Sequence, residues 1–123
     1  MKLPKEIGIY PLCNVNVKLI FTKGPDGSGI GRPNETDLPT IKIGIDQPWW
    51  KVFTVLLHEA EEFCFYQFGY SYTPSSISIV DSTTYTFHLT HGELCRVHEE
   101  VGYFIAKALD DVCKFYKKYH KED

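Results

Sequence analysis

The stretch from Trp49 to Phe68 is predominantly apolar, yet its positions 58–62 contain the polar block His-Glu-Ala-Glu-Glu. This length and hydrophobicity predict a helix that is buried in the core. On a helix, His58 and Glu62 are one turn apart and lie side by side, and Glu59 lies on the flank of the same face. Because burial of ionisable groups without partners costs several kcal/mol, the block needs a physical explanation.

A bound metal ion is one explanation for this block. In helices with the pattern H-E-x-x-H, two histidines at helical spacing hold zinc and the adjacent glutamate acts as the general base. Here Glu62 stands at the position of the second histidine. The alternative is a helix whose acidic side faces water, with His58 satisfied by a neighbouring carboxylate. Both interpretations are open at this stage, because glutamate-rich helices are common.

The size and charge of the chain limit the possible classes of protein. A chain of 123 residues predicts one domain with a single core, here residues 1–123. The net charge of −3 gives no support for nucleic-acid binding, which usually needs a basic face. No apolar run is long enough to cross a membrane without including charges. We therefore expect neither nucleic acid nor a membrane as a partner.

The four cysteines are Cys13, Cys64, Cys95 and Cys113, which are far apart in sequence and form no C-x-x-C pair. The residues after Met1 do not resemble a secretory signal peptide. This pattern predicts reduced thiols in a cytoplasmic protein rather than a disulfide framework.

Two strands are predicted before the apolar helix. Residues 14–21 and 41–45 alternate between apolar and polar side chains, as half-buried strands do. The segment 22–39 between them is rich in glycine and proline and is expected to be a flexible connector. Asp46 or Gln47 is expected to cap the helix, with Pro48 in its first turn and Gly69 at its end.

The C-terminal half predicts a hairpin and a long helix. Residues 77–80 and 84–89 are candidate strands of the hairpin, and the helix runs from His91 to about Tyr119. Thr90 and Glu93 fit a capping box at its start. Together these elements predict an α+β fold, with a small antiparallel sheet, a buried motif helix and a long C-terminal helix.

A catalytic zinc site takes three protein ligands and leaves one position for water. His58 and Glu62 supply two, and His91 is the first candidate for the third, followed by His98 and then His88. At the start of a helix the dipole disfavours the imidazolium, which keeps the ring of His91 neutral and able to bind metal. Cys95 lies one turn after His91 and has ligand spacing, although cysteine on an apolar helix is more often a core residue. His120 is expected to be a solvated tail residue.

The strand at 41–46, the helix carrying V-L-L-H-E-A-E-E and the following His-led helix together resemble the minimal zincin-type metallopeptidase domains. Small phage and prophage proteins of this kind are similar, and repressor-cleaving and SprT-like peptidases are more distantly so. The resemblance covers about residues 40–109. It implies a zincin-like fold, one zinc ion held by the motif helix and a water activated by Glu59. Glu62 departs from the family pattern, because a histidine is usual there, and carboxylate ligation would weaken the Lewis acidity of the metal.

Two functions are therefore expected from the sequence. The first is a zinc-dependent hydrolase of the peptidase type, with Glu59 as catalytic base and His58, Glu62 and His91 as ligands. The second is a non-catalytic zincin-fold protein that binds a macromolecular partner through exposed aromatic residues, of which Trp49, Trp50, Tyr70 and Tyr72 are candidates. A nucleotide deaminase is disfavoured, because the P-C-x-x-C half of its signature is absent.

Overall fold

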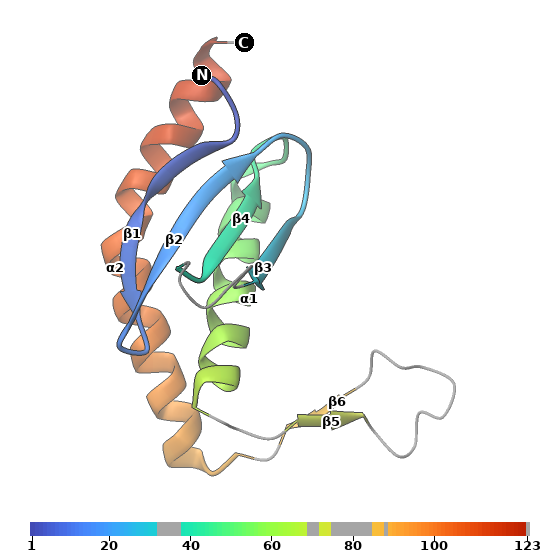
Figure 1. Cartoon of the computed structure of the whole chain (residues 1–123), viewed down its shortest axis with the longest axis vertical. Coiled ribbons are helices and arrows are strands. Elements are labelled where there is room, and N and C mark those ends of the chain that lie inside the picture. The colour runs from blue at the N-terminus through green and yellow to red at the C-terminus, as the bar shows by residue number, and fades with distance from the viewer. Residues whose placement is uncertain (32–37, 69–71, 75–84, 88, 123) are drawn as a thin grey trace.

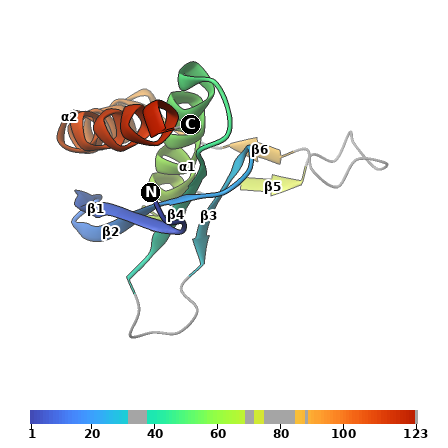
Figure 2. The ribbon, with the colours of Figure 1, turned by 90° about the horizontal axis from the view of Figure 1, so that it is seen from above.

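The computed structural model describes residues 1–31, 38–68, 72–74, 85–87 and 89–122. It has an α+β fold in two layers, in which both long helices cover the same face of a four-stranded sheet (Figures 1 and 2). The strands of this sheet are β1 (Lys5–Leu12), β2 (Val15–Thr22), β3 (Gly27–Gly31) and β4 (Thr40–Gly44). The helices are α1 (Trp49–Gln67) and α2 (His91–Glu122), and a separate pair of short strands is β5 (Tyr72–Pro74) and β6 (Tyr85–Phe87).

The four-stranded sheet is mixed, with the order β1-β2-β4-β3. β1 and β2 are antiparallel, β2 and β4 are parallel, and β3 pairs antiparallel to β4 at the edge. The expectation of an antiparallel sheet was therefore wrong for the central pair. The physical reason is that the chain turns back twice between β2 and β4, so that β4 enters the sheet beside β2 and in the same direction.

Alternation along the central strands explains how the sheet packs against the helices. Val17, Leu19 and Phe21 of β2 are fully buried, as are Ile41 and Ile43 of β4. Because Leu19 pairs with Ile41 and Phe21 with Ile43, these side chains form one apolar surface beneath the helices. The helices complete the core with a further set of buried residues: Val52, Leu56, Ala60, Phe63, Val97, Val101, Phe104, Ala108 and Val112.

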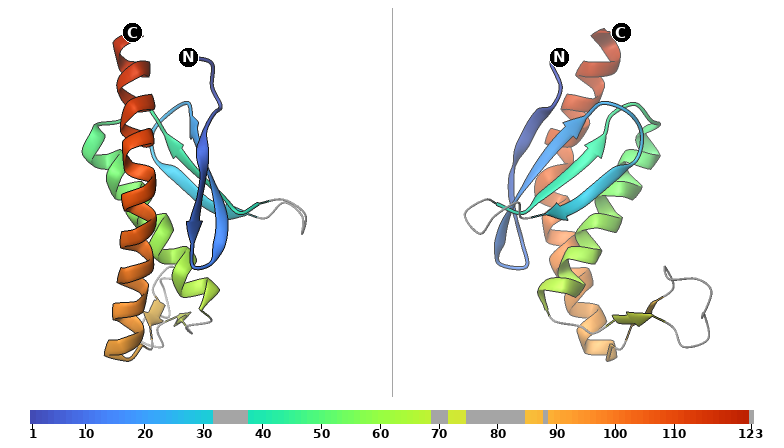
Figure 3. Two further views of the ribbon diagram at one scale, coloured as in Figure 1. Left: turned by 90° about the vertical axis from the view of Figure 1, so that its left-hand side faces the viewer. Right: turned by 45° about the vertical axis from the view of Figure 1, so that its right-hand side comes forward.

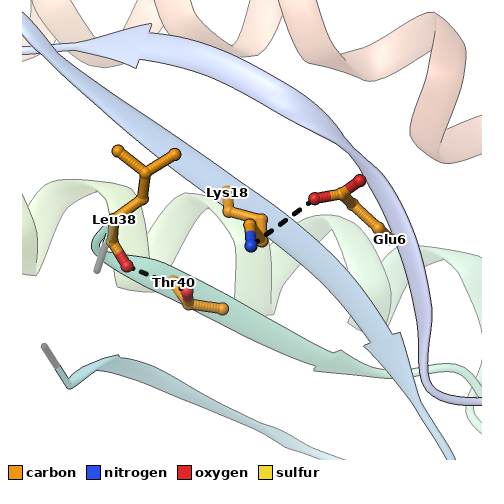
Figure 4. A network of polar contacts seen from close by, with 4 residues as sticks. All are labelled: Glu6, Lys18, Leu38 and Thr40. Carbon is orange, nitrogen blue, oxygen red and sulfur yellow. Dashed lines mark hydrogen bonds and ion pairs between the residues drawn. The ribbon is translucent and has the colours of Figure 1, made fainter. Parts of the chain in front are cut away.

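The opposite face of the sheet is mostly polar. Figure 4 shows Lys18 Nζ at 3.6 Å from Glu6 Oε1, and the Thr40 hydroxyl donating to the carbonyl of Leu38 at 3.1 Å. Neither helix covers this face (Figure 2). An exposed ion pair of this kind contributes at most about 1 kcal/mol to stability.

The glycine-rich segment was expected to be a connector, but it contains the edge strand β3. Gly27 lies so close to α1 that an added Cβ would meet Val55 Cγ1 and the carbonyl of Lys42. Glycine is therefore used here for close approach of a strand to a helix, and not for flexibility. The side chain of Gln47 holds the residue before this strand in place. It accepts a hydrogen bond from the backbone N–H of Asp26 and donates to the carbonyls of Asp26 and Gly44.

The start of α1 also differs from the expectation. Pro48 occupies the N-cap and no side chain caps the helix, because Asp46 and Gln47 bind other parts of the chain. At the start of α2, in contrast, the predicted capping box is confirmed. The Thr90 N–H donates to Glu93 Oε1 at 2.9 Å, and the Glu93 N–H donates to Thr90 Oγ1 at 3.1 Å.

Other predicted elements have mixed outcomes. The strands at 14–21 and 41–45 are confirmed as β2 and β4, whereas β1 was not foreseen. The predicted strand at 77–80, like Gly69, lies outside the described residues. The strand predicted at 84–89 contains β6, which pairs with β5. Among the described residues, no helix has both the length and the hydrophobicity that a membrane span requires.

Cys13 and Cys64 form a disulfide, so the expectation of reduced thiols was wrong for this pair. Cys13 and Asn14 form the tight β1–β2 turn, both with positive φ, and this turn brings Cys13 within 6.2 Å (Cα–Cα) of Cys64 on α1. The two residues are 51 positions apart in sequence, and only the tertiary fold brings them together. The expected cytoplasmic location thereby loses part of its support, because it relied on four reduced thiols. Cys95 and Cys113 are free.

Candidate metal centre on α1

The two sides of α1 differ sharply in burial. The buried side chains Val52, Leu56 and Ala60 recur every four residues and face the core. His58 is two residues from both Leu56 and Ala60, which places it on the opposite side of the helix. The side chains of His58 and Glu62 are 67% and 56% exposed. The motif helix is therefore buried on one side only, and the polar block lies at the surface and not inside the core as the sequence suggested.

The predicted pairing across one helical turn is present. His58 Nε2 lies 3.1 Å from Glu62 Oε2. One ligand atom from each of His58, Glu59 and Glu62 can be chosen so that all three lie within 4.8 Å of one another. Nitrogen and oxygen ligands about 2.0–2.2 Å from a tetrahedral zinc ion are themselves about 3.4 Å apart. The His58–Glu62 pair, at 3.1 Å, is close to this spacing.

The electrostatics of the cluster favour a cation. Partial burial, followed by the negative charge of Glu62, raises the pKa of Glu59, whereas His58 acts in the opposite direction. Two neighbouring carboxylates with a single histidine leave an excess of negative charge. A divalent ion would remove the repulsion between Glu59 and Glu62 and would favour the ionised form of both.

His91 is the first residue of α2 and is exposed. It does not belong to the group formed by His58, Glu59 and Glu62 in the part of the chain that the structure describes. Its ring instead approaches its own helix, with Nε2 at 3.5 Å from Cys95 Sγ. Of the other candidates, His98 is exposed on α2, and His88 lies outside the described residues.

His120 is more than the solvated tail residue expected from the sequence. Its Nε2 lies 2.9 Å from the carbonyl oxygen of Ile45, and its ring packs 4.2 Å from that of Tyr116.

The aromatic residues proposed for partner binding differ in their exposure. Trp49 packs against Tyr116, whereas Trp50 is 64% exposed. Nothing can be stated for Tyr70 or for the side chain of Tyr72, which lie outside the described part.

Tyr66 is a neighbour of the cluster that the sequence analysis did not identify. It is 73% exposed and lies four residues after Glu62, hence one turn further along the same side of α1. The spacing itself could have identified it. It was overlooked because a tyrosine in an apolar helix is more simply interpreted as a core residue.

Comparison of the chain with protein-family models, with curated proteins and with solved structures finds no match. The resemblance to zincin-type domains therefore rests on the motif of α1 alone. What can be said of function comes from the geometry of this cluster.

Proposed function

We propose that His58 and Glu62 bind one divalent metal ion, most suitably zinc, that Glu59 acts beside it as the general base, and that the protein is a zinc-dependent hydrolase acting on peptide-like substrates. The observation that carries this proposal is the gathering of one imidazole and two carboxylates within 4.8 Å on an exposed helix face. Such a donor set suits zinc, which binds histidine nitrogen and carboxylate oxygen. Exposure of the cluster leaves room for water and a substrate.

The three residues have different roles in this proposal. His58 and Glu62 are the ligands, because their donor atoms are already 3.1 Å apart. Glu59 is the general base, since it lies beside the two ligands; partial burial, followed by the charge of Glu62, raises its pKa above the ordinary value. Zinc would supply the polarisation of the scissile carbonyl and of the attacking water. His91 is left out of the ligand set, because it lies outside the cluster, so that water would fill the two remaining positions of a tetrahedral ion and the site departs from the usual three protein ligands.

Tyr66 supports a peptide-like substrate. An exposed aromatic ring one turn beyond Glu62 provides a surface against which a substrate side chain can pack. Its hydroxyl can also donate a hydrogen bond to a carbonyl oxygen.

Metal analysis and activity measurements on three variants test the proposal. The wild-type protein should contain one zinc per chain, and His58→Ala should lose it. Glu59→Gln should retain zinc and lose at least 100-fold in hydrolysis of a fluorogenic peptide library, as expected for a general base. Glu61→Gln is the matched control, because Glu61 lies on the same helix but outside the cluster. Absence of stoichiometric metal in the wild-type protein would refute the proposal, and loss of zinc in Glu59→Gln would make Glu59 a ligand and refute its role as base.

A second function, binding of a protein partner without catalysis, is favoured by the exposure of Trp50 and Tyr66 on α1. Aromatic residues of this kind are enriched in protein interfaces. The variant Glu59→Gln separates the two functions. A protein whose biological effect survives Glu59→Gln but is lost in Trp50→Ala acts by binding, and one with the reverse behaviour acts by catalysis.

A further inference from the structure

The charges of the two helices are separated towards opposite ends of the molecule. In α2, residues 107–122 contain five lysines and three carboxylates, whereas residues 91–106 contain one arginine and three glutamates. In α1 the order is reversed, because Lys51 lies near its start and the three glutamates of the polar block lie in its second half. Since the C-terminal end of α2 lies beside the beginning of α1 (Figure 3), one end of the molecule is basic and the other is acidic.

The lysines at the basic end share one side of α2. The buried residues Phe104, Ala108 and Val112 recur every four residues and define the side that faces the core. At about 100° per residue, the five lysines all lie on the side turned away from it, and all are exposed. They form a strip about 21 Å long, which we call the lysine strip. Its members are Lys107, Lys114, Lys117, Lys118 and Lys121.

The positive charge of the lysine strip is not neutralised by neighbouring side chains. No carboxylate whose position the structure describes lies within 4.0 Å of any of its ammonium groups. Asp111, which belongs to the same half of the helix, instead accepts a hydrogen bond from the hydroxyl of Tyr10 at 2.6 Å.

Stabilisation of the helix explains only a small part of this strip. Cations interact favourably with the negative end of the helix dipole, but the effect is confined to the last turn. The basic residues of the last turn of α2 are His120 and Lys121. The dipole therefore accounts for one member of the strip and leaves four lysines without a structural role.

An exposed aromatic ring lies at the same end of the molecule. Trp49 packs against Tyr116 of α2 with their ring centroids 5.3 Å apart, which places the first turn of α1 beside the strip. The next residue, Trp50, is 64% exposed, and Lys51 Nζ lies 5.8 Å from the centre of its ring. A solvent-facing indole beside several cations has the two features of single-strand binding surfaces, a stacking platform and contacts for phosphates.

The shape of this surface favours one class of polyanion over two others. A strip of charges along a helix matches the linear backbone of a nucleic acid, and the ring of Trp50 can stack only on a base that is not already inside a duplex. A membrane surface fits less well. The apolar side of α2, which would have to enter the lipid, is buried against the rest of the core.

The acidic end of the molecule does not prevent such binding. Glu99 and Lys118 are separated by about 28 Å along the axis of α2, whereas the Debye length is about 10 Å at 0.1 M ionic strength. A strand bound at the basic end is therefore screened from the glutamates. The net charge of −3, which gave no support for nucleic-acid binding, averages over two ends of opposite sign.

We propose that the lysine strip and Trp50 bind single-stranded nucleic acid without sequence specificity. The ammonium groups contact successive phosphates, and the indole ring of Trp50 stacks on one base. The surface shares no residue with the cluster on α1, so the inference stands independently of the proposed hydrolase.

Fluorescence anisotropy of a labelled oligothymidylate, titrated with the full chain in the presence of a chelator, tests the proposal. We expect saturable binding. With four phosphates neutralised, the affinity should fall about 50-fold between about 50 mM and about 200 mM salt. A duplex of the same length should bind at least fivefold more weakly at the lower salt concentration, because its bases are not available to Trp50.

A pair of matched double variants locates the surface. Lys114→Gln/Lys118→Gln should weaken binding at least tenfold and reduce the salt slope by about 1.4. Lys18→Gln/Lys42→Gln removes the same charge from the face of the sheet that the helices leave open, and should change the affinity less than twofold. Circular dichroism of each variant confirms that it is folded.

A second pair of variants tests the stacking contact. Trp50→Ala should weaken binding at least fivefold, whereas Tyr66→Ala, which removes an exposed ring from the acidic half of α1, should leave it unchanged. Because the titration contains only the purified chain and the oligonucleotide, it also distinguishes this use of Trp50 from contact with a protein partner.

Four results would overturn the proposal. They are the absence of saturable binding up to about 100 µM protein, equal losses in the two lysine double variants, full affinity in Trp50→Ala, and equal affinity for duplex and single strand. Vesicles of phosphatidylcholine with phosphatidylserine provide the remaining comparison. Binding to these vesicles that is lost in Lys114→Gln/Lys118→Gln, without binding to the oligonucleotide, would assign the strip to an anionic lipid surface instead.

Discussion

At its C-terminal end α2 is tied by hydrogen bonds to distant parts of the chain, whereas the hydrogen bonds of Thr90, His91 and Cys95 at its N-terminal end join residues within one helical turn. The hydroxyl of Tyr116 donates to the carbonyl of Gln47 at 2.7 Å, the hydroxyl of Tyr119 donates to Asp46 Oδ1 at 2.7 Å, and His120 contacts the carbonyl of Ile45. These partners are 69 to 75 residues away in sequence. Figure 3 shows this end of α2 beside the beginning of α1.

The N-terminal end has hydrogen bonds of a different kind. The contacts that involve Thr90, His91 and Cys95 join residues three or four positions apart. Both ends of the helix thus carry a histidine, but only His120 holds two segments of the fold together. The comparison teaches that the two histidines differ in their contribution to stability, because His120 joins distant segments whereas His91 contacts a residue of its own helix.

The largest expected loss of stability is that of Tyr116→Ala, which we compare with a second tyrosine of α2. Tyr116→Ala removes packing against Trp49 and His120 together with a hydrogen bond, and should lower the free energy of unfolding by about 3 kcal/mol. Tyr103→Ala is the control, because Tyr103 is 56% exposed, and should cost less than about 0.5 kcal/mol. Urea unfolding followed by far-ultraviolet circular dichroism measures both. Equal losses of unfolding free energy in the two variants would contradict the expectation that Tyr116, which contacts distant segments, contributes more to stability than the exposed Tyr103.

A smaller effect is expected for the two histidines. His120→Ala removes the contact with the carbonyl of Ile45 and should lower the free energy of unfolding by about 1 kcal/mol. His91→Ala should change it by less than about 0.5 kcal/mol in the absence of metal, because the side chain is exposed. The same unfolding experiment, made in the presence of a chelator, measures the difference. A larger loss for His91→Ala than for His120→Ala would contradict the structural role given to His120.

The smallest expected effect is on the stability of the folded state at acidic pH. Hydrogen bonds from the Gly24 N–H and from the Tyr119 hydroxyl lower the pKa of Asp46 below its ordinary value of 3.8. The folded state therefore binds this proton more weakly than the unfolded state does, so the stabilisation is complete above pH 3.8 and is lost as the pH falls through the lowered pKa. Asp46→Asn should weaken the loss of stability in this acid range.

The matched control for this prediction is Asp110→Asn, which replaces an exposed aspartate in the middle of α2. The difference in unfolding free energy between pH 5 and pH 3 should remain that of the wild-type protein in this variant. An identical acid dependence in the wild-type protein and in Asp46→Asn would show that the carboxylate does not anchor the end of α2.

Local features of the sequence predicted a large part of the fold. The alternation in β2 and β4 and the capping box at Thr90 depend on residues that are close in sequence, and both are present in the structure. The pairing of His58 with Glu62 is of the same kind, because helical spacing alone places the two side chains together.

Other features had no local signal. The edge strand β3 consists largely of glycine, a residue with low strand propensity, and it pairs because β4 lies beside it. The anchoring of Tyr116 and His120 depends on a loop about 70 residues away. The ring of His91 was expected to lie over α1, but the crossing of the two helices, which no sequence pattern specifies, leaves it beside Cys95.

The sequence by itself determined β2, β4 and the two helices, and which polar side chains meet within one helical turn, because both follow from the period of the backbone. Only the tertiary structure decided that the polar side of α1 faces solvent and that Cys13 meets Cys64. The same holds for the two histidine-bearing ends of α2, whose different environments depend on the crossing of α1 and α2. The reason is that burial and long-range contacts depend on how whole elements pack, and neighbours in sequence contain no information about that packing.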